Sequence, residues 1–193
     1  MPNESGSIVS GRGESRVELP AGTPLDRALL LEAWGGLLSR TFNIEGELTS
    51  RQGTEREDLG SSGWGRDRSH IIVPPGYSSL HVTGDPTRKP GKWNLLISEP
   101  STAPEIGIEA AGVGASRVFA YHGGTVQASV EFESQGCLAF YGFDGTRRRE
   151  LLSRDTKFRG SVKIPGPGLI AVQSPVAPHW GSIPPWRITL QGK

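Results

Sequence analysis

Two short charged segments of this chain carry the residues from which specific chemistry is most readily expected. GTERED (53–58) places three carboxylates beside one arginine, and GTRRRE (145–150) places three arginines beside one glutamate, so the local charges are −2 and +2. The side chains in question are Glu55, Glu57 and Asp58 in the first segment, and Arg147, Arg148 and Arg149 in the second. Opposite charges of this kind form complementary contacts between protein surfaces. Two other interpretations stay open: both segments face only water, or the arginines contact phosphate in weak, salt-sensitive binding.

The two charged segments occupy equivalent places in an internal repeat. Residues 53–76 align with residues 145–168 without a gap, and nine of the 24 aligned positions are identical. Further along, Trp93 aligns with Trp186, and each begins a segment with alternating apolar residues. Self-similarity at a nearly constant period is the signature of a repeated structural unit. The sequence therefore predicts that the protein is built twice, with the charge of one segment reversed between the copies.

Upstream of the charged segments, the repeat decides between a helix and a strand. TPLDRALLLEAWGG (23–36) has the capping residues of a helix. However, AWGG (33–36) aligns with YHGG (121–124), whose preceding residues are β-branched and aromatic. Equivalent segments of a duplicated domain should share a conformation, so we predict a strand at 28–34. The same alignment pairs the strand that follows AWGG with the strand that follows YHGG.

Composition favours short strands over helices. The chain has 27 glycines and 15 prolines among its 193 residues, a content typical of many short strands joined by turns. We predict an all-β, internally duplicated antiparallel β-sandwich of jelly-roll-like type, with two similar small sandwich domains in tandem. The expected boundaries are an N-terminal tail at 1–15, a first sandwich at 16–100 and a second at 101–193.

In general pattern, the predicted sandwich resembles the small noncatalytic β-sandwiches appended to secreted bacterial enzymes. The resemblance rests on a DG turn, at Asp144 and Gly145, and on a final strand of the form Trp-x-Ile, at Trp186 to Ile188. It implies a noncatalytic module. The chain departs from that pattern because its N-terminus has neither the basic region nor the apolar run of a secretion signal.

The residue types that support catalysis or metal binding are too scattered to predict an enzyme. None of the four histidines occurs at a metal-ligand spacing, and the lone cysteine, Cys137, lies in an apolar run, where we expect a buried thiol. Asp67, Ser69 and His70 are close in sequence, but neighbours along a strand point to opposite faces. We therefore expect no catalytic residue, no metal and no cofactor.

Loop aromatics provide an alternative function. Trp64 lies in SSGWGRDR, and His179 and Trp180 lie in APHWGSIPPW. Such side chains can stack on sugar rings, close the open end of a sandwich or anchor a protein interface. The alternative is a lectin-like sandwich that binds a carbohydrate or another ligand through these three residues. Trp93 and Trp186, which begin equivalent strands, are instead expected in the two cores.

Overall charge and hydropathy restrict the partners. A net charge of +1 argues against nucleic acid as a partner, and no apolar run is long enough for membrane insertion. Without a secretion signal, we expect the cytoplasm or a particle assembled there. The leading hypothesis is a noncatalytic structural protein, a subunit or decoration of a larger particle such as a phage virion or an injection-type machine. It would bind itself or other subunits partly through the complementary charged segments.

Overall fold

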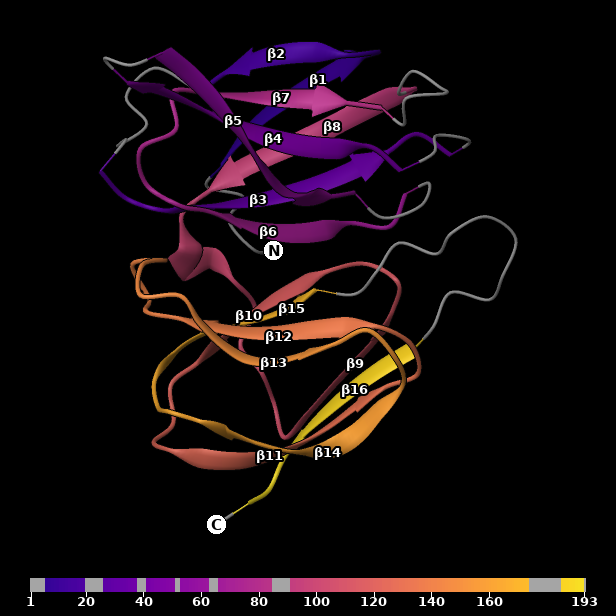
Figure 1. The fold of residues 1–193 in the computed structure, drawn as a ribbon, viewed down its shortest axis with the longest axis vertical. Helices are drawn as coiled ribbons and strands as arrows, with labels where there is room; N and C mark the ends of the chain where they lie inside the picture. The colour runs from indigo at the N-terminus through magenta and orange to yellow at the C-terminus, as the bar shows by residue number, and fades with distance from the viewer. Residues whose placement is uncertain are drawn as a thin grey trace.

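The architecture is given by a computed structural model, which describes residues 6–19, 26–37, 41–50, 53–62, 66–84, 91–173 and 185–192. Within these residues the chain forms sixteen β-strands in four four-stranded sheets, with one short 3₁₀ helix, η1 (Pro100–Thr102), between the halves. We call the unit built by β1–β8 the N-terminal sandwich and the unit built by β9–β16 the C-terminal sandwich (Figure 1).

The two sandwiches have the same strand order. The first contains β1 (Ser7–Arg12), β2 (Ser15–Glu18), β3 (Leu29–Gly35), β4 (Asn43–Ser50), β5 (Gly53–Ser61), β6 (Ser69–Val73), β7 (Ser79–Thr83) and β8 (Lys92–Ser98). The second contains β9 (Glu109–Val113), β10 (Arg117–Tyr121), β11 (Val126–Phe132), β12 (Gly136–Tyr141), β13 (Arg149–Arg154), β14 (Phe158–Ile164), β15 (Gly168–Gln173) and β16 (Pro185–Leu190). Their sheets run β1-β8-β3-β6 and β2-β7-β4-β5, then β9-β16-β11-β14 and β10-β15-β12-β13. This is the order of an eight-stranded jelly roll, so the predicted fold class is confirmed.

A β-bulge at the same place in both sandwiches confirms the alignment of the charged segments. The pairing skips one residue between Gly60 and Asp58 in β5, and one residue between Leu152 and Glu150 in β13. Asp58 and Glu150 are therefore equivalent, which is the 92-residue offset found in the sequence. The gap-free alignment does not hold to its end: Ile72 is equivalent to Lys163, an offset of 91, because they pair with the equivalent residues Leu30 and Gln127.

The upstream part of the sequence alignment is wrong. AWGG lies at the end of β3, which is equivalent to β11, whereas YHGG begins with the last residue of β10, the equivalent of β2. Leu31 and Ala128 hold the same position beside β8 and β16, so the offset here is 97 rather than 88. A glycine pair and an alternating apolar pattern occur at many hairpins and do not identify a register. The strand predicted at 28–34 is itself confirmed as β3.

The segment expected to be an N-terminal tail contains an edge strand. β1 pairs with β8 along its full length, and β2 begins at Ser15. Val9 packs against the core, while its neighbour Ile8 is 57% exposed. Because β1 has so few apolar side chains that face the core, its sequence lacks the alternating apolar pattern from which a strand is predicted. Within the predicted tail, Ser7–Arg12 and Ser15 are therefore strand residues.

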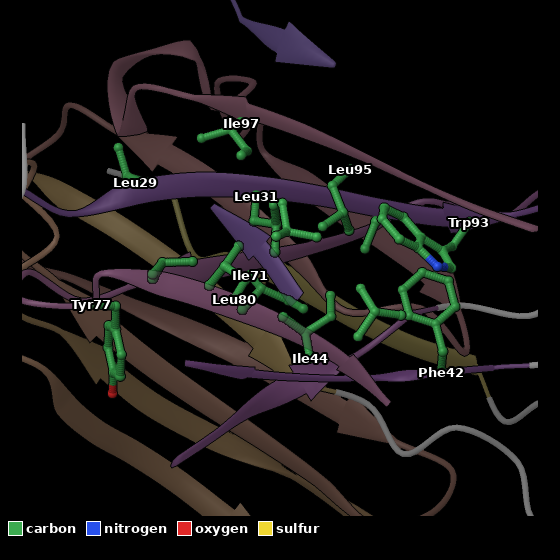
Figure 2. Packing of buried hydrophobic residues seen from close by; sticks show 14 residues of the cluster. Leu29, Leu31, Phe42, Ile44, Ile71, Tyr77, Leu80, Trp93, Leu95 and Ile97 are labelled. Atoms are coloured by element: carbon green, nitrogen blue, oxygen red, sulfur yellow. The ribbon is translucent and has the colours of Figure 1, made fainter. Parts of the chain in front are cut away.

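A tryptophan packed over a glycine recurs at the same corner of both sandwiches. Trp93 and Trp186 are each 2% exposed, which confirms their predicted core positions. A Cβ placed on their strand neighbours Gly11 and Gly112 would overlap the indole rings. This close approach requires glycine at both places. Figure 2 shows Trp93 beside Phe42 in the N-terminal core.

A third apolar cluster joins the two sandwiches, and we call it the junction. Its members are Ala28, Leu30 and Ile72 of the N-terminal sandwich, with Ala103, Val118, Ala120, Ala139, Tyr141, Leu169 and Ala171 of the C-terminal half. Along the strands these residues alternate with those of the two cores, so both faces of the two inner sheets are buried. The four sheets consequently stack as four layers (Figure 1). Burial of both faces of β3 explains the apolar run that resembles a helix in the sequence.

The sandwiches stack head to tail, because the junction joins unlike sheets. Sheet β1-β8-β3-β6 of the first meets sheet β10-β15-β12-β13 of the second. On the two outermost faces, the positions equivalent to junction residues are polar. Leu30 and Ile72 correspond to Gln127 and Lys163, while Val118, Tyr141, Leu169 and Ala171 correspond to Arg16, Glu47, Ser79 and His81. These polar residues end the stack after two units, as capping repeats do in solenoid proteins.

Exchanging one pair of equivalent residues tests this arrangement. Leu30 is 1% exposed, and we expect Leu30→Gln to lower the free energy of unfolding by about 2–4 kcal/mol, because it removes buried apolar area and buries an amide. The matched variant Gln127→Leu alters an exposed position, and should change the free energy by less than about 1 kcal/mol. Urea unfolding measures both effects. Equal losses in the two variants would contradict burial at the junction.

Candidate functional site

The acidic segment lies on β5, at the edge of the outermost sheet of the N-terminal sandwich. The carboxylate of Glu57 accepts a hydrogen bond from the hydroxyl of Tyr77 at 2.6 Å, and burial together with this carboxylate raises the pKa of Tyr77. Asp58 accepts a hydrogen bond from the backbone N–H of Gly60 at 2.9 Å, within the bulge. Glu55 is exposed near the start of the strand. Glu57 and Asp58, two of the three acidic residues predicted to contact a partner, therefore also stabilise the local structure.

The turn that precedes the arginines is anchored on the N-terminal sandwich. The Asp144 carboxylate accepts a hydrogen bond from the backbone N–H of Thr146 at 3.0 Å, and Gly145 has a φ of 72°. This is the DG turn expected from the sequence. A Cβ on Gly145 would overlap the methyl group of Ala28, so both the backbone conformation and the contact require glycine.

The basic segment follows this turn. Arg147 is exposed and has a φ of 57°, Arg148 lies 3.8 Å from the carboxylate of Glu150, and Arg149 begins β13. The two equivalent segments do not have the same local structure. In the N-terminal sandwich, the pairing of β4 with β5 continues to Gly53, which places the acidic residues on a strand; pairing of β12 with β13 stops at Arg149.

Within one molecule the two charged segments do not pair with each other. Arg56 lies 3.8 Å from Glu47, and Arg148 makes its local contact with Glu150. Among the described residues, no ion pair joins the acidic segment to the basic one. The acidic segment lies on an outermost sheet and the basic segment at an inner sheet of the other sandwich.

A polar cluster on the outer face of sheet β2-β7-β4-β5 is a feature that sequence reasoning missed. At its centre Glu47, 7% exposed, accepts hydrogen bonds from Arg16 at 2.7 Å and Ser79 at 3.2 Å, and contacts Nε2 of His81 at 2.7 Å. Arg16 also donates to the Ser79 hydroxyl at 3.1 Å. The four residues come from three strands that are far apart in the chain. No local motif could have revealed them, because only strand pairing brings them together.

Every charged or hydrogen-bonding group that faces Glu47 in this polar cluster favours its ionised form. Burial acts to raise the pKa of Glu47, but hydrogen bonds with His81, Ser79 and Arg16, and the charge of Arg16, outweigh it and hold the pKa below its usual value of 4.5. Glu47 is therefore a carboxylate at neutral pH. Because its oxygens already have partners, the cluster stabilises this outer face.

The neighbouring residues Ser69 and His70 point to opposite faces of β6, as expected from strand alternation. Ser69 is 1% exposed on the face that carries Ile71 into the N-terminal core. His70 lies on the opposite face, toward the C-terminal sandwich, and its backbone N–H donates to the Ser116 carbonyl at 2.9 Å. The two side chains are therefore not brought together for nucleophilic chemistry.

Cys137 is half-buried, slightly more exposed than expected from its apolar surroundings in sequence. Burial raises the pKa of its thiol, and the nearby Glu150 carboxylate acts in the same direction. Its Sγ lies 4.0 Å from that carboxylate. The thiol is therefore protonated at neutral pH, which disfavours a nucleophilic role.

Trp64, His179 and Trp180, the predicted aromatic ligand site, lie outside the described residues. The structure instead shows an aromatic pair that the sequence analysis did not single out. The rings of His122 and Phe143 stack at 4.9 Å between centroids, and Phe143 is 37% exposed. In the sequence, this pair could have been suspected from the position of Phe143 directly before the DG turn.

Among the described residues, no group of three or more His, Cys, Asp or Glu side chains is arranged to hold a metal ion. No helix in the described part of the chain is long and apolar enough to span a membrane.

Comparison with known proteins gives no family. No family model matches the chain, and no curated protein matches it. Among solved structures, the tandem CBM22-1–CBM22-2 domain of Paenibacillus barcinonensis Xyn10C aligns with a TM-score of 0.31 and 11% identity over 96% of this chain and 85% of that one. The CUB1-EGF-CUB2 domain of human MASP-1/3 aligns with a TM-score of 0.28 and 6% identity over 96% and 93%. Scores and identities this low carry no inference about function.

The polar cluster around Glu47 leads to a prediction about stability in acid. Because folding lowers the pKa of Glu47, its contribution to stability is complete above the unfolded-state value of 4.5 and is lost as the pH falls through the lower folded-state pKa. We expect Glu47→Gln to reduce the loss of stability below pH 4.5 relative to the wild type. Chemical denaturation at a series of pH values measures this. Glu14→Gln, at an exposed position between β1 and β2, is the control and should keep the wild-type profile; identical profiles for all three proteins would contradict the prediction.

Proposed function

We propose that this chain is a noncatalytic structural subunit that associates with itself, or with other subunits, through its two charged segments. The observation that carries the proposal is that equivalent segments of opposite charge lie on one body joined by a buried apolar junction, with no ion pair between them among the described residues. The proposed setting is a larger particle, such as a virion or an injection-type machine, assembled in the cytoplasm.

The relation between the segments favours one type of contact. The acidic and basic segments hold equivalent positions in the two sandwiches. The movement that superposes one sandwich on the other therefore also carries the acidic segment onto the basic one. Contact between the acidic segment of one molecule and the basic segment of the next is heterologous, and repeats into rings or filaments. Contact of either segment with its own copy is repulsive.

The strength of such a contact is limited. Exposed ion pairs contribute about 0–1 kcal/mol each, and salt screens them over about 8–10 Å. Phe143, 37% exposed, lies in the same loop as the arginines and provides an apolar side chain beside them. The charged segments would therefore orient the subunits and speed their encounter, while apolar contacts contribute most of the binding free energy.

Charge exchange at two equivalent positions tests the proposal. Glu55 and Arg147 are exposed, whereas Glu57 and Asp58 make local hydrogen bonds. We expect Arg147→Glu to weaken self-association because it places an acid against the acidic segment, and Glu55→Lys in the same chain to restore part of it. Light scattering and sedimentation velocity at about 20 mM and about 500 mM salt measure the particle mass, with association at the lower salt only.

The control for this experiment is Lys163→Glu. It makes the same change of net charge on the outer face of β14, away from both segments, and should associate as the wild type does. A wild-type protein that is monomeric at low salt, or an Arg147→Glu variant that associates unchanged, would rule out this mode of assembly.

A second candidate function is ligand binding through aromatic side chains, favoured by the exposed stack of His122 and Phe143. An aromatic face next to polar groups can bind a sugar ring. A glycan array with the wild type and the variants Phe143→Ala, Trp64→Ala and Trp180→Ala tests it. Binding that is lost in one of these variants would support this function in place of assembly.

A further inference from the structure

A polar cleft of about 270 Å³ opens where the two sandwiches meet. It is lined by Asp58, Leu59, Gly60 and Ser61 of β5, His70 and Ile71 of β6, and Ser116 and Gln173 of the C-terminal sandwich. Neither sandwich forms this cleft alone. It exists because the junction brings the end of β5 and strand β6 against the start of β10 and the end of β15.

The walls of the cleft are held in place by the backbone. The N–H of His70 donates to the carbonyl of Ser116 at 2.9 Å, which ties the two sandwiches together beside the opening. On the other wall, the bulge gives Gly60 a φ of 140°, and its N–H donates to the Asp58 carboxylate. The cleft is therefore largely formed before any ligand arrives, which lowers the cost of binding.

His70, which borders the cleft, carries a ring nitrogen that solvent does not reach. Nδ1 of His70 is buried and has no hydrogen-bond partner among the described residues. Burial lowers the pKa of His70, so the imidazole is neutral at neutral pH, with one N–H and one lone pair. Because Nδ1 is buried, the groups that a ligand could contact are those of the other polar residues of the lining.

The charges around the cleft nearly balance. Asp58 is the single charged residue of the lining. The charges that act on His70 are those of Glu32, Arg68 and Arg117, and Arg68 is paired with Glu32 at 2.9 Å. The site is therefore suited neither to an anion nor to a metal ion. The remaining polar groups are hydroxyls of Ser61 and Ser116 and the amide of Gln173, each able to donate and to accept.

We infer that this cleft between the sandwiches binds a small, neutral, polyhydroxylated ligand of the size of one sugar ring. Each hydroxyl of such a ligand can donate to Asp58 and accept from Gln173 or a serine. The volume lies just below the range of about 300–1,000 Å³ of sites for larger ligands. This binding function goes beyond the proposed assembly role and does not depend on it.

The test uses the full chain and four neutral monosaccharides, glucose, galactose, mannose and xylose, titrated separately while amide NMR spectra are recorded. About 500 mM salt suppresses electrostatic association, so the result is independent of the proposed assembly. We expect at least one sugar to shift the resonances of residues 58–61, 70, 116 and 173 with a Kd of about 1–10 mM. Gln173→Leu, which keeps the size of the side chain and removes its amide, should weaken binding about tenfold.

The matched control is Gln127→Leu, the same substitution on the outer face of the C-terminal sandwich, which should bind as the wild type does. A second variant, Gln173→Glu, retains one acceptor and tests the amide donor if the leucine variant unfolds. Absence of shifts at about 50 mM of every sugar, shifts confined to other regions, or equal affinity of wild type and both Gln173 variants would overturn the inference.

Discussion

The apolar contact between the two inner sheets is the interaction on which the rest of the structure depends. Each sandwich has fewer than one hundred residues, a size at which a single core leaves little surplus stability. At the junction, Leu30 and Ile72 of one sandwich pack with Val118, Tyr141 and Leu169 of the other. Their burial gives the inner sheets two apolar faces each and fixes the relative position of the charged segments and of the cleft.

Duplication produced two copies of a fold without producing a symmetric molecule. The copies meet through unlike sheets, so each copy uses one outer face for contact and leaves the other in solvent. The face that is apolar in one copy is therefore free to become polar in the other, as with Tyr141 against Glu47 and Leu169 against Ser79. The buried carboxylate of Glu47 is stable there because Arg16, Ser79 and His81 form hydrogen bonds with it.

Sequence reasoning succeeded where a structural constraint acts twice. Trp93 and Trp186 were correctly predicted to lie in the two cores, because each sandwich packs a tryptophan ring over a glycine at the same corner and the residue is therefore repeated in the sequence. The offset at the charged segments was correct because identical residues cluster there, but the glycine pair of AWGG gave a false register. β1 escaped notice because an edge strand with one inward apolar side chain, Val9, has no periodic pattern.

The sequence by itself determined the class of fold, the duplication and the reversal of charge between equivalent segments. These follow from composition, alternation and self-similarity, which are properties of the chain taken locally. Only the tertiary structure decided that Leu30 and Ile72 face a second sandwich, that Glu47 meets His81, and that His70 borders a cleft. Alternation shows that a strand has two faces, but which surface covers each face depends on residues more than thirty positions away, and only folding brings them together.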